Sequence, residues 1–140
     1  MEEKLKTITL SNPLLSHFKT DFESIPFDKI KSKHFIPAIK KGINLALDNI
    51  RLICNNADKP TFENTNLALE SCGSILGRNS SILFNLNSAE TTDEIQLITS
   101  QAAPLLTKFQ NDINLNEVLF DRIRYVYENT DQKNLNTEQK

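Results

Sequence analysis

The stretch Asp58-Lys59-Pro60-Thr61-Phe62-Glu63-Asn64-Thr65 separates two long amphipathic segments of the 140-residue chain. Pro60 cannot continue the helix before it, because proline has no amide hydrogen to donate. Thr61 can cap the next helix, and Glu63 places a carboxylate near the positive end of that helix. The stretch therefore predicts a helical hairpin, with one long helix on either side of it.

The first helix of this hairpin is expected to begin at Ser32 and to end near Ala57, with Pro37 in its first turn. Its apolar residues recur every three or four positions, which is typical of one helix face, and a second row widens that face. We therefore expect burial on more than one side, with 37–56 as the hairpin arm. The first row is Ile36, Ile39, Ile43, Ala46, Ile50 and Ile53, and the second is Ala38, Leu45 and Leu52.

The second helix of the hairpin is expected over residues 62–87. Gly73 and Gly77 lie on one face of it, and each glycine costs about 1 kcal/mol against alanine inside a helix. Close approach of a neighbouring helix would explain that cost, so we expect Gly73→Leu to be destabilising. The apolar rows are Phe62, Leu69, Cys72 and Leu76, then Ala68, Ile75 and Ile82, with Phe84 and Leu86 in the last turns.

Two further helices follow. Thr91 and Glu94 match a capping box, in which the Thr91 hydroxyl accepts the Glu94 amide, and Pro104 is expected to kink the helix that starts there. Asn116 is expected to cap a fourth helix. The third helix carries Ile95, Ile98, Ala102, Leu106, Phe109 and Ile113, and the fourth carries Leu119, Phe120, Ile123, Val126 and Tyr127.

Three glycines and five prolines leave little room for the turns of a β fold. The sequence predicts an all-α fold of antiparallel helical hairpins with about four main helices. A short helix is expected near 13–20, followed by an extended turn at Ile25-Pro26. We divide the chain into an N-terminal extension (1–11), a helical domain (12–129) and a polar tail (130–140).

Composition excludes several classes of function. A net charge of -2 with no tryptophan argues against a nucleic-acid surface, and the basic group Lys29, Lys31, Lys33, Lys40 and Lys41 is interpreted as a solvated face. No window reaches the ~20 apolar residues of a membrane span, and the first residues contain no signal-peptide core. These observations favour a cytoplasmic protein, unless a leader has been removed.

No catalytic, cofactor-binding or metal-binding residue is predicted. His17 and His34 lie on different elements and lack the spacing of an H-E-x-x-H zinc motif. Cys54 and Cys72 are displaced by about 13 Å along an antiparallel hairpin, beyond the ~7 Å limit for a disulfide, and are read as reduced core residues. The carboxylate pairs, Glu2 with Glu3 and Asp93 with Glu94, are assigned to a terminus and a capping turn.

Several motifs, in order along the chain, resemble those of the thimet-oligopeptidase family of zinc metallopeptidases. They are Pro26-Phe27-Asp28-Lys29-Ile30-Lys31, His34-Phe35-Ile36-Pro37-Ala38-Ile39, Pro60-Thr61-Phe62-Glu63-Asn64-Thr65, Ala68-Leu69-Glu70-Ser71-Cys72-Gly73, Phe84-Asn85-Leu86-Asn87-Ser88-Ala89, Asp93-Glu94-Ile95-Gln96, Pro104-Leu105-Leu106 and Leu119-Phe120-Asp121-Arg122-Ile123. The resemblance covers roughly residues 12–140 and is greatest to the bacterial oligopeptidase A and peptidyl-dipeptidase branch. No single motif is diagnostic, but their order makes the match specific.

The resemblance implies the N-terminal helical segment of a larger, two-lobed peptidase, cut as its next helix begins. In such a parent, zinc and the H-E-x-x-H glutamate act far C-terminal to this chain, and the N-terminal helices help to wall a channel for short peptides. The expected partners are those peptides and a C-terminal catalytic lobe, with no nucleic acid or membrane. No zinc or catalytic residue of the family is carried over to this chain.

Two other hypotheses remain. The same apolar rows would suit a free-standing helical module that binds a partner helix without catalysis. A free-standing enzyme ranks last, because no catalytic constellation is visible. If part of a larger enzyme is missing, the orphaned apolar surface should be exposed or covered by self-association.

Overall fold

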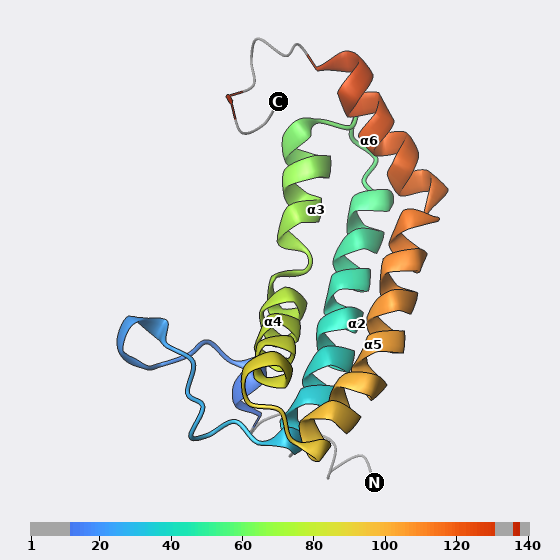
Figure 1. Ribbon diagram of the computed structural model, residues 1–140. Helices are drawn as coiled ribbons and strands as arrows, with labels where there is room; N and C mark the ends of the chain where they lie inside the picture. Colours follow the sequence, from blue (N-terminus) through green and yellow to red (C-terminus); the bar gives the residue numbers. More distant parts are fainter. Residues whose placement is uncertain (1–11, 131–135, 138–140) are drawn as a thin grey trace, which may run out of the picture.

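The computed structural model describes residues 12–130 and 136–137. The predicted N-terminal extension, most of the predicted polar tail and the pair Glu2 and Glu3 lie outside the described residues. Within them the fold is all-α, and no strand is present. The chain runs up, down and up again along one bundle axis (Figure 1).

The bundle is built from three antiparallel columns. The first is α2 (Phe35–Cys54), the second is α3 (Ala68–Ser71) followed by α4 (Ser74–Ala89), and the third is α5 (Asp93–Asn114) followed by α6 (Glu117–Asn129). Short turns η1 (Pro13–Leu15), η2 (Asp21–Glu23) and η3 (Ser32–His34) precede α2, and the π-helical turn η4 (Phe62–Leu67) leads into α3. The prediction of an all-α hairpin fold with about four main helices is confirmed.

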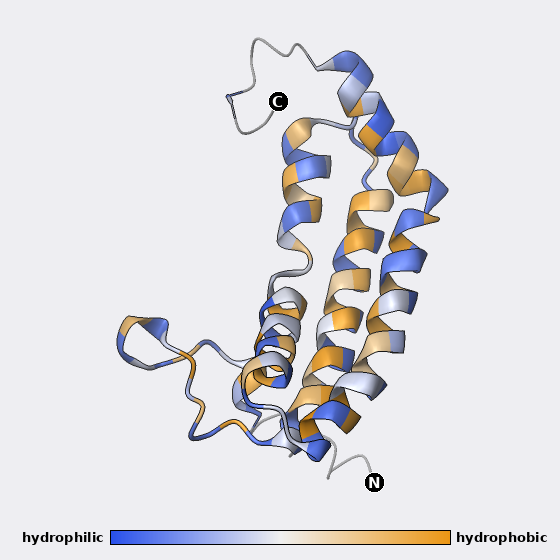
Figure 2. Cartoon of the chain, in the orientation of Figure 1, coloured by the Kyte–Doolittle hydropathy of each residue, from blue (hydrophilic) through white to orange (hydrophobic). Residues whose placement is uncertain are grey.

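α2 is the central column. It packs against α3 and α4 of the second column and against α5 and α6 of the third. Figure 2 shows that most of the α2 ribbon carries the hydrophobic colour. Ile39, Ala46, Ile50 and Ile53 of the predicted first row are buried, and Ile36 and Ile43 are half-buried. The second row is only partly confirmed, because Leu52 is 70% exposed.

The close helix approach predicted at Gly73 is wrong. A Cβ added to Gly73 or Gly77 would meet nothing within 4 Å. The tight contact is instead at Gly42 of α2, where an added Cβ would lie 3.1 Å from the Cα of Leu76 in α4. Gly42 therefore sets the α2–α4 distance, and Gly73→Leu is no longer expected to overpack a neighbour.

Other element boundaries also differ from the prediction. The predicted 62–87 helix is broken at Cys72 and Gly73, where the Cys72 amide bonds to the Leu69 carbonyl at 3.1 Å and α4 starts anew. The first long helix ends at Cys54 and not near Ala57. In place of a helix near 13–20 there is one turn over Pro13–Leu15, capped by the Asn12 side chain.

Of the N-caps predicted for the last two helices, the one for α6 is correct and the one for α5 is wrong. Asn116 does cap α6, since its side chain accepts the Leu119 amide at 3.0 Å. α5 is capped by Thr92 and not by Thr91, because the Thr92 hydroxyl accepts the Ile95 amide at 3.2 Å. The capping residue thus lies one position later than predicted. α5 continues as one helix across Pro104.

The core has two parts. The larger cluster fills the lower bundle in Figure 1 and includes Leu14, Phe35, Ile39 and Leu83, all nearly inaccessible. The smaller cluster fills the upper bundle and is centred on Ile50, Ile53 and Leu119. Phe109 of α5 packs against both.

Candidate functional site

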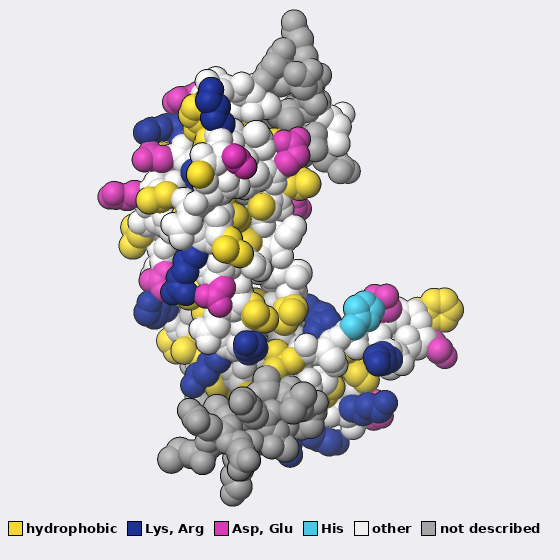
Figure 3. All heavy atoms as spheres, turned by 180° about the vertical axis from the view of Figure 1, so that it is seen from behind, with side chains coloured by type: hydrophobic (Ala, Val, Ile, Leu, Met, Phe, Trp, Pro, Cys, Tyr) yellow, Lys and Arg dark blue, Asp and Glu magenta, His cyan; other side chains and the backbone are white. Residues whose placement is uncertain are grey.

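The two histidines lie on different elements and have different surroundings. His17 lies before the arm (residues 19–29) that projects from the bundle (Figure 3), and its Nε2 is 3.5 Å from an oxygen of Glu23, with both side chains mostly exposed. His34 ends η3, where its Nδ1 accepts the Lys31 amide at 3.0 Å. The structure does not bring these two imidazoles together on one element.

The pKa of His34 is lowered from its usual value. Desolvation by burial is the largest cause, followed by the positive charges of Lys33 and Lys31. A neutral ring also suits the hydrogen bond, because Nδ1 must be unprotonated to accept the Lys31 amide. The His34 ring therefore closes the η3 turn that precedes α2 by accepting the Lys31 amide.

The two cysteines are free, as predicted, and both are half-buried. Their side chains pack against the smaller hydrophobic cluster. Cys54 Sγ contacts the Asn116 side chain, with 3.7 Å to its Nδ2, and the Cys72 thiol donates to the Ala68 carbonyl at 3.1 Å. Burial raises the pKa of the Cys72 thiol, which disfavours the nucleophilic thiolate.

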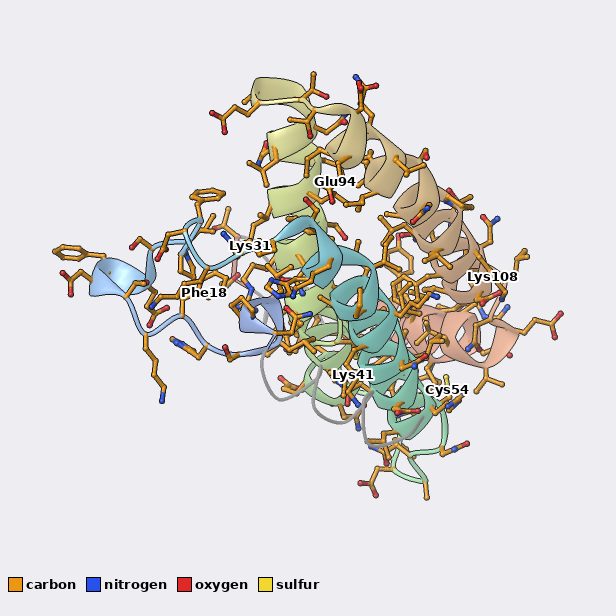
Figure 4. All side chains as sticks on the ribbon, turned by 90° about the horizontal axis from the view of Figure 1, so that it is seen from below. Phe18, Lys31, Lys41, Cys54, Glu94 and Lys108 are labelled. Atoms are coloured by element: carbon orange, nitrogen blue, oxygen red, sulfur yellow. The ribbon has the colours of Figure 1, made fainter. Side chains whose placement is uncertain are left out.

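The remaining polar candidates behave as surface or capping groups. Asp93 and Glu94 lie in the first turn of α5, as the sequence indicated. The five lysines of the basic group are all exposed, and Figure 4 shows Lys31 and Lys41 well apart. Across residues 12–130 and 136–137, no three His, Cys, Asp or Glu residues are placed to hold a metal ion.

Two buried polar side chains, Arg122 and Asn79, make hydrogen bonds between elements that were not predicted from the sequence. Arg122 of α6 is only 8% exposed and donates to the Asn56 carbonyl at 2.8 Å and to Asn64 Oδ1 at 3.3 Å. It thereby ties α6 to the turn that divides the hairpin. In the lower bundle, Asn79 Nδ2 donates to the Leu14 carbonyl at 3.0 Å.

Arg78 supports the same segment as Asn79. One of its terminal nitrogens donates to the Leu14 carbonyl at 2.8 Å and to the Ser16 carbonyl at 3.2 Å. Its guanidinium also lies 4.3 Å from the centre of the Phe18 ring. A pocket of about 410 Å³ lined by Ser74, Ile75 and Arg78 is found beside this contact. These contacts of Arg78 fix η1 on α4.

Exposed apolar side chains are the more informative surface feature. On α6, the pair Val118 and Tyr125 and the pair Phe120 and Tyr127 are each seven residues apart, so each pair shares one side of the helix. We call these two pairs the α6 flanks. They lie on either side of the buried seam formed by Leu119, Arg122 and Val126, and their exposures range from 37% for Tyr125 to 78% for Tyr127.

The arm carries a second exposed apolar group. Phe22 is fully exposed at φ 57°, and Glu23 follows at φ 56°. This left-handed conformation costs roughly 1–2 kcal/mol for a residue other than glycine. The turn is held by the Glu23 amide on the Thr20 carbonyl at 3.0 Å. Figure 3 shows hydrophobic side chains at the tip of the arm.

Comparison with known proteins shows which class of protein this helical chain is similar to. No family model matches it. It is 36% identical over 118 residues to dipeptidyl carboxypeptidase of Salmonella typhimurium, covering 84% of this chain and 17% of the relative. The chain is therefore homologous to part of a bacterial peptidase.

Two further relatives define the group more narrowly. Dipeptidyl carboxypeptidase of Escherichia coli is 34% identical over 131 residues, and oligopeptidase A of the same organism is 31% identical over 131 residues. Each match covers 94% of this chain and 19% of the relative, so the chain spans less than a fifth of the length of these curated relatives. The predicted resemblance to the thimet-oligopeptidase family, in its oligopeptidase A and peptidyl-dipeptidase branch, is confirmed.

One negative finding concerns membranes. None of the helices in the described part of the chain is both long enough and apolar enough to cross a bilayer.

Proposed function

We propose that this chain is the N-terminal helical part of a zinc-dependent oligopeptidase or peptidyl-dipeptidase that hydrolyses short peptides. The observation that carries the proposal is the match to two dipeptidyl carboxypeptidases, at 36% and 34% identity over 84% and 94% of this chain. The second of these matches spans nearly the whole chain and not one isolated element. A shared role in the whole enzyme accounts for that spread better than a shared fold alone.

Within that enzyme the chain serves access and stability, and not the chemical step. The donor set of the described residues does not fit a zinc ion, since no three potential ligands gather. Zinc and the glutamate that activates water would be held by another part of the parent. By the family resemblance, the helices here would help to wall the channel that admits short peptides.

The α6 flanks are the surface we assign to the rest of the parent. Phe120 and Tyr127 on one flank are each more than half exposed, as is Val118 on the other. Aromatic side chains bury about 150–250 Å² each when covered, so leaving several in water forfeits a large apolar contribution. A catalytic lobe packed on α6 would recover it, and self-association would do so in the chain alone.

The alternative is a free-standing helical interaction module. The observation that favours it is also on α6, because apolar residues at helical spacing on both flanks would suit a partner helix laid alongside. In that case the chain binds its partner through Val118 and Tyr125 or through Phe120 and Tyr127, and has no connection to hydrolysis.

The DNA that follows codon 140 separates the two functions. The proposed function predicts a continuous reading frame that encodes an H-E-x-x-H motif. The product of that complete frame should release fragments from short peptides, lose this activity on chelation and recover it with added zinc. A frame that ends without such a motif, together with a partner captured through the α6 flanks, would support the interaction module instead.

A further inference from the structure

The break between α3 and α4 coincides with the boundary between the two hydrophobic clusters. Ala68, Leu69 and Cys72, before the break, pack on the upper cluster. Leu76 and Leu83, after it, belong to the lower cluster. The second column therefore changes cores at Gly73.

The other two columns cross the same boundary. In α2 the lower cluster extends to Ile43 and the upper cluster begins at Ile50. In α5 the last fully buried member of the lower cluster is Ala102, Leu106 and Phe109 still pack on that cluster, and Phe109 and Ile113 pack on the upper cluster, so the cores meet between Ala102 and Ile113. Pro104 lies two residues after Ala102, and it cannot donate the helical hydrogen bond to the carbonyl four residues earlier. The second column is thus broken where the cores meet, and the third lacks a helical hydrogen bond one to two turns before Phe109, which contacts both cores.

Polar contacts cross-link each side of the boundary internally. Above it, Arg122 bonds to the Asn56 carbonyl and to Asn64. Below it, Asn79 bonds to the Leu14 carbonyl, as does Arg78. From the breaks and these contacts we divide the bundle into an upper block (residues 47–71 and 105–129) and a lower block (residues 12–45 and 74–103), with Leu106 and Phe109 reaching the lower cluster from the upper block.

The glycine at the break has no packing reason to be there. A Cβ at Gly73 would meet nothing within 4 Å, so a larger residue would fit. Its φ of -103° and ψ of 7° lie outside the helical region but are accessible to other residues. What glycine adds at this position is backbone freedom.

We propose that the bundle bends at Gly73 and Pro104, so that the upper block rocks against the lower block with α2 as the continuous spine. The three columns cross the boundary with one intact helix, one broken helix and one helix that lacks a hydrogen bond. Each block moves as a unit because it has its own core and its own polar cross-links. The bend changes the direction in which α6 presents its flanks.

Residual dipolar couplings of backbone amides test this bend directly in the 140-residue chain, at a concentration where it is monomeric by sedimentation. Couplings from the lower and upper blocks should require two alignment tensors of different magnitude, because inter-block motion averages one more than the other. In the Gly73→Ala, Pro104→Ala double variant the two magnitudes should converge. Alanine in place of Gly73 alone should lower the population of bent conformers about fivefold, from the difference in helix propensity.

Gly77→Ala is the matched control. Gly77 also has open space around it but lies within α4, inside the lower block. The control should keep the two-tensor behaviour of the unmodified chain. One tensor of one magnitude for both blocks of the unmodified chain would overturn the proposal, and so would a Gly77→Ala effect equal to that at Gly73. The measurement does not involve peptide hydrolysis, so its outcome is independent of the proposed function.

Discussion

Gly42→Ala tests whether the α2–α4 contact is as tight as the structure shows. Gly42 lies in the middle of α2 and faces the first turn of α4. An alanine Cβ there would lie 3.1 Å from Leu76 Cα and 3.2 Å from Leu76 Cβ. A Cα cannot rotate away as a side-chain tip can, so the two helices must separate by a few tenths of an ångström.

The expected effect is the difference between two opposing contributions. Replacing a mid-helix glycine with alanine stabilises by about 1 kcal/mol through helix propensity. Overpacking a close contact typically costs about 1–3 kcal/mol. Gly42→Ala should therefore range from neutral to about 2 kcal/mol destabilising. Gly77→Ala, which meets nothing within 4 Å, should keep the propensity gain of up to about 1 kcal/mol.

Urea and thermal denaturation of the two variants provide the assay. For a domain of this size, 1 kcal/mol corresponds to a shift in Tm of about 3–5 °C. Gly77→Ala should thus melt several degrees above Gly42→Ala, with the unmodified chain between them or level with the latter. Equal stabilisation by both substitutions would show that Gly42 has free space, and the assignment of the helix contact to Gly42 would be refuted.

Three further substitutions or conditions test individual contacts. Thr92→Ala should cost about 1 kcal/mol in urea denaturation by removing the α5 N-cap, whereas Thr91→Ala should change the free energy of unfolding little; the reverse order would restore the predicted capping box. Arg122→Met should cost about 1–3 kcal/mol, because it leaves the partly buried Asn56 carbonyl without its donor, and unchanged stability would mean that these hydrogen bonds are unimportant. The lowered pKa of His34 means that the unfolded chain binds a proton more readily, so its contribution to stability should be constant above the usual pKa of about 6.5 and fall as pH drops through that value. A His34→Gln variant should lose this part of the pH dependence in denaturation curves recorded from pH 7.5 to 5, and an identical pH profile in both proteins would contradict the assignment.

The helices were predictable because their signals are local. Apolar spacing of three and four fixed the buried faces of α2 and α5, and Asn116 marked the start of α6 through its side-chain chemistry. The family resemblance was also carried by sequence alone. Short motifs in a fixed order survive where no single motif is diagnostic.

The contacts between helices were not predictable in the same way. Periodicity identifies the buried face of a helix, but not how near the backbone of the neighbouring helix comes. The sequence therefore predicts a close helix contact at Gly73, whereas the structure has it at Gly42. Leu52 continues an apolar row by its spacing yet lies beyond the reach of the neighbouring columns. The left-handed backbone at Phe22 has no signal in the sequence, because phenylalanine rarely adopts it.

In the candidate site, too, local features could be predicted from the sequence and features that depend on packing could not. The lack of catalytic spacing around His17 and His34 could be read from the sequence, and so could the free cysteines. The α6 flanks could not, since Val118, Tyr125 and Tyr127 become informative only once the seam of Leu119 and Val126 is known to be buried. Whether a side chain on α6 is exposed depends on which helices pack beside it, and the apolar spacing along the sequence does not identify those neighbours.

The central claim is that this chain performs the role of the homologous segment in a peptidase. A chimaera in which it replaces the aligned segment of the Escherichia coli dipeptidyl carboxypeptidase tests this most directly, with an unrelated helical bundle of equal length as the control. We expect the chimaera to release dipeptides with a kcat/KM within about tenfold of the parent, a loss of no more than about 1.4 kcal/mol, and the control to be inactive. A folded chimaera with the parent's metal content that releases no dipeptide would contradict the account.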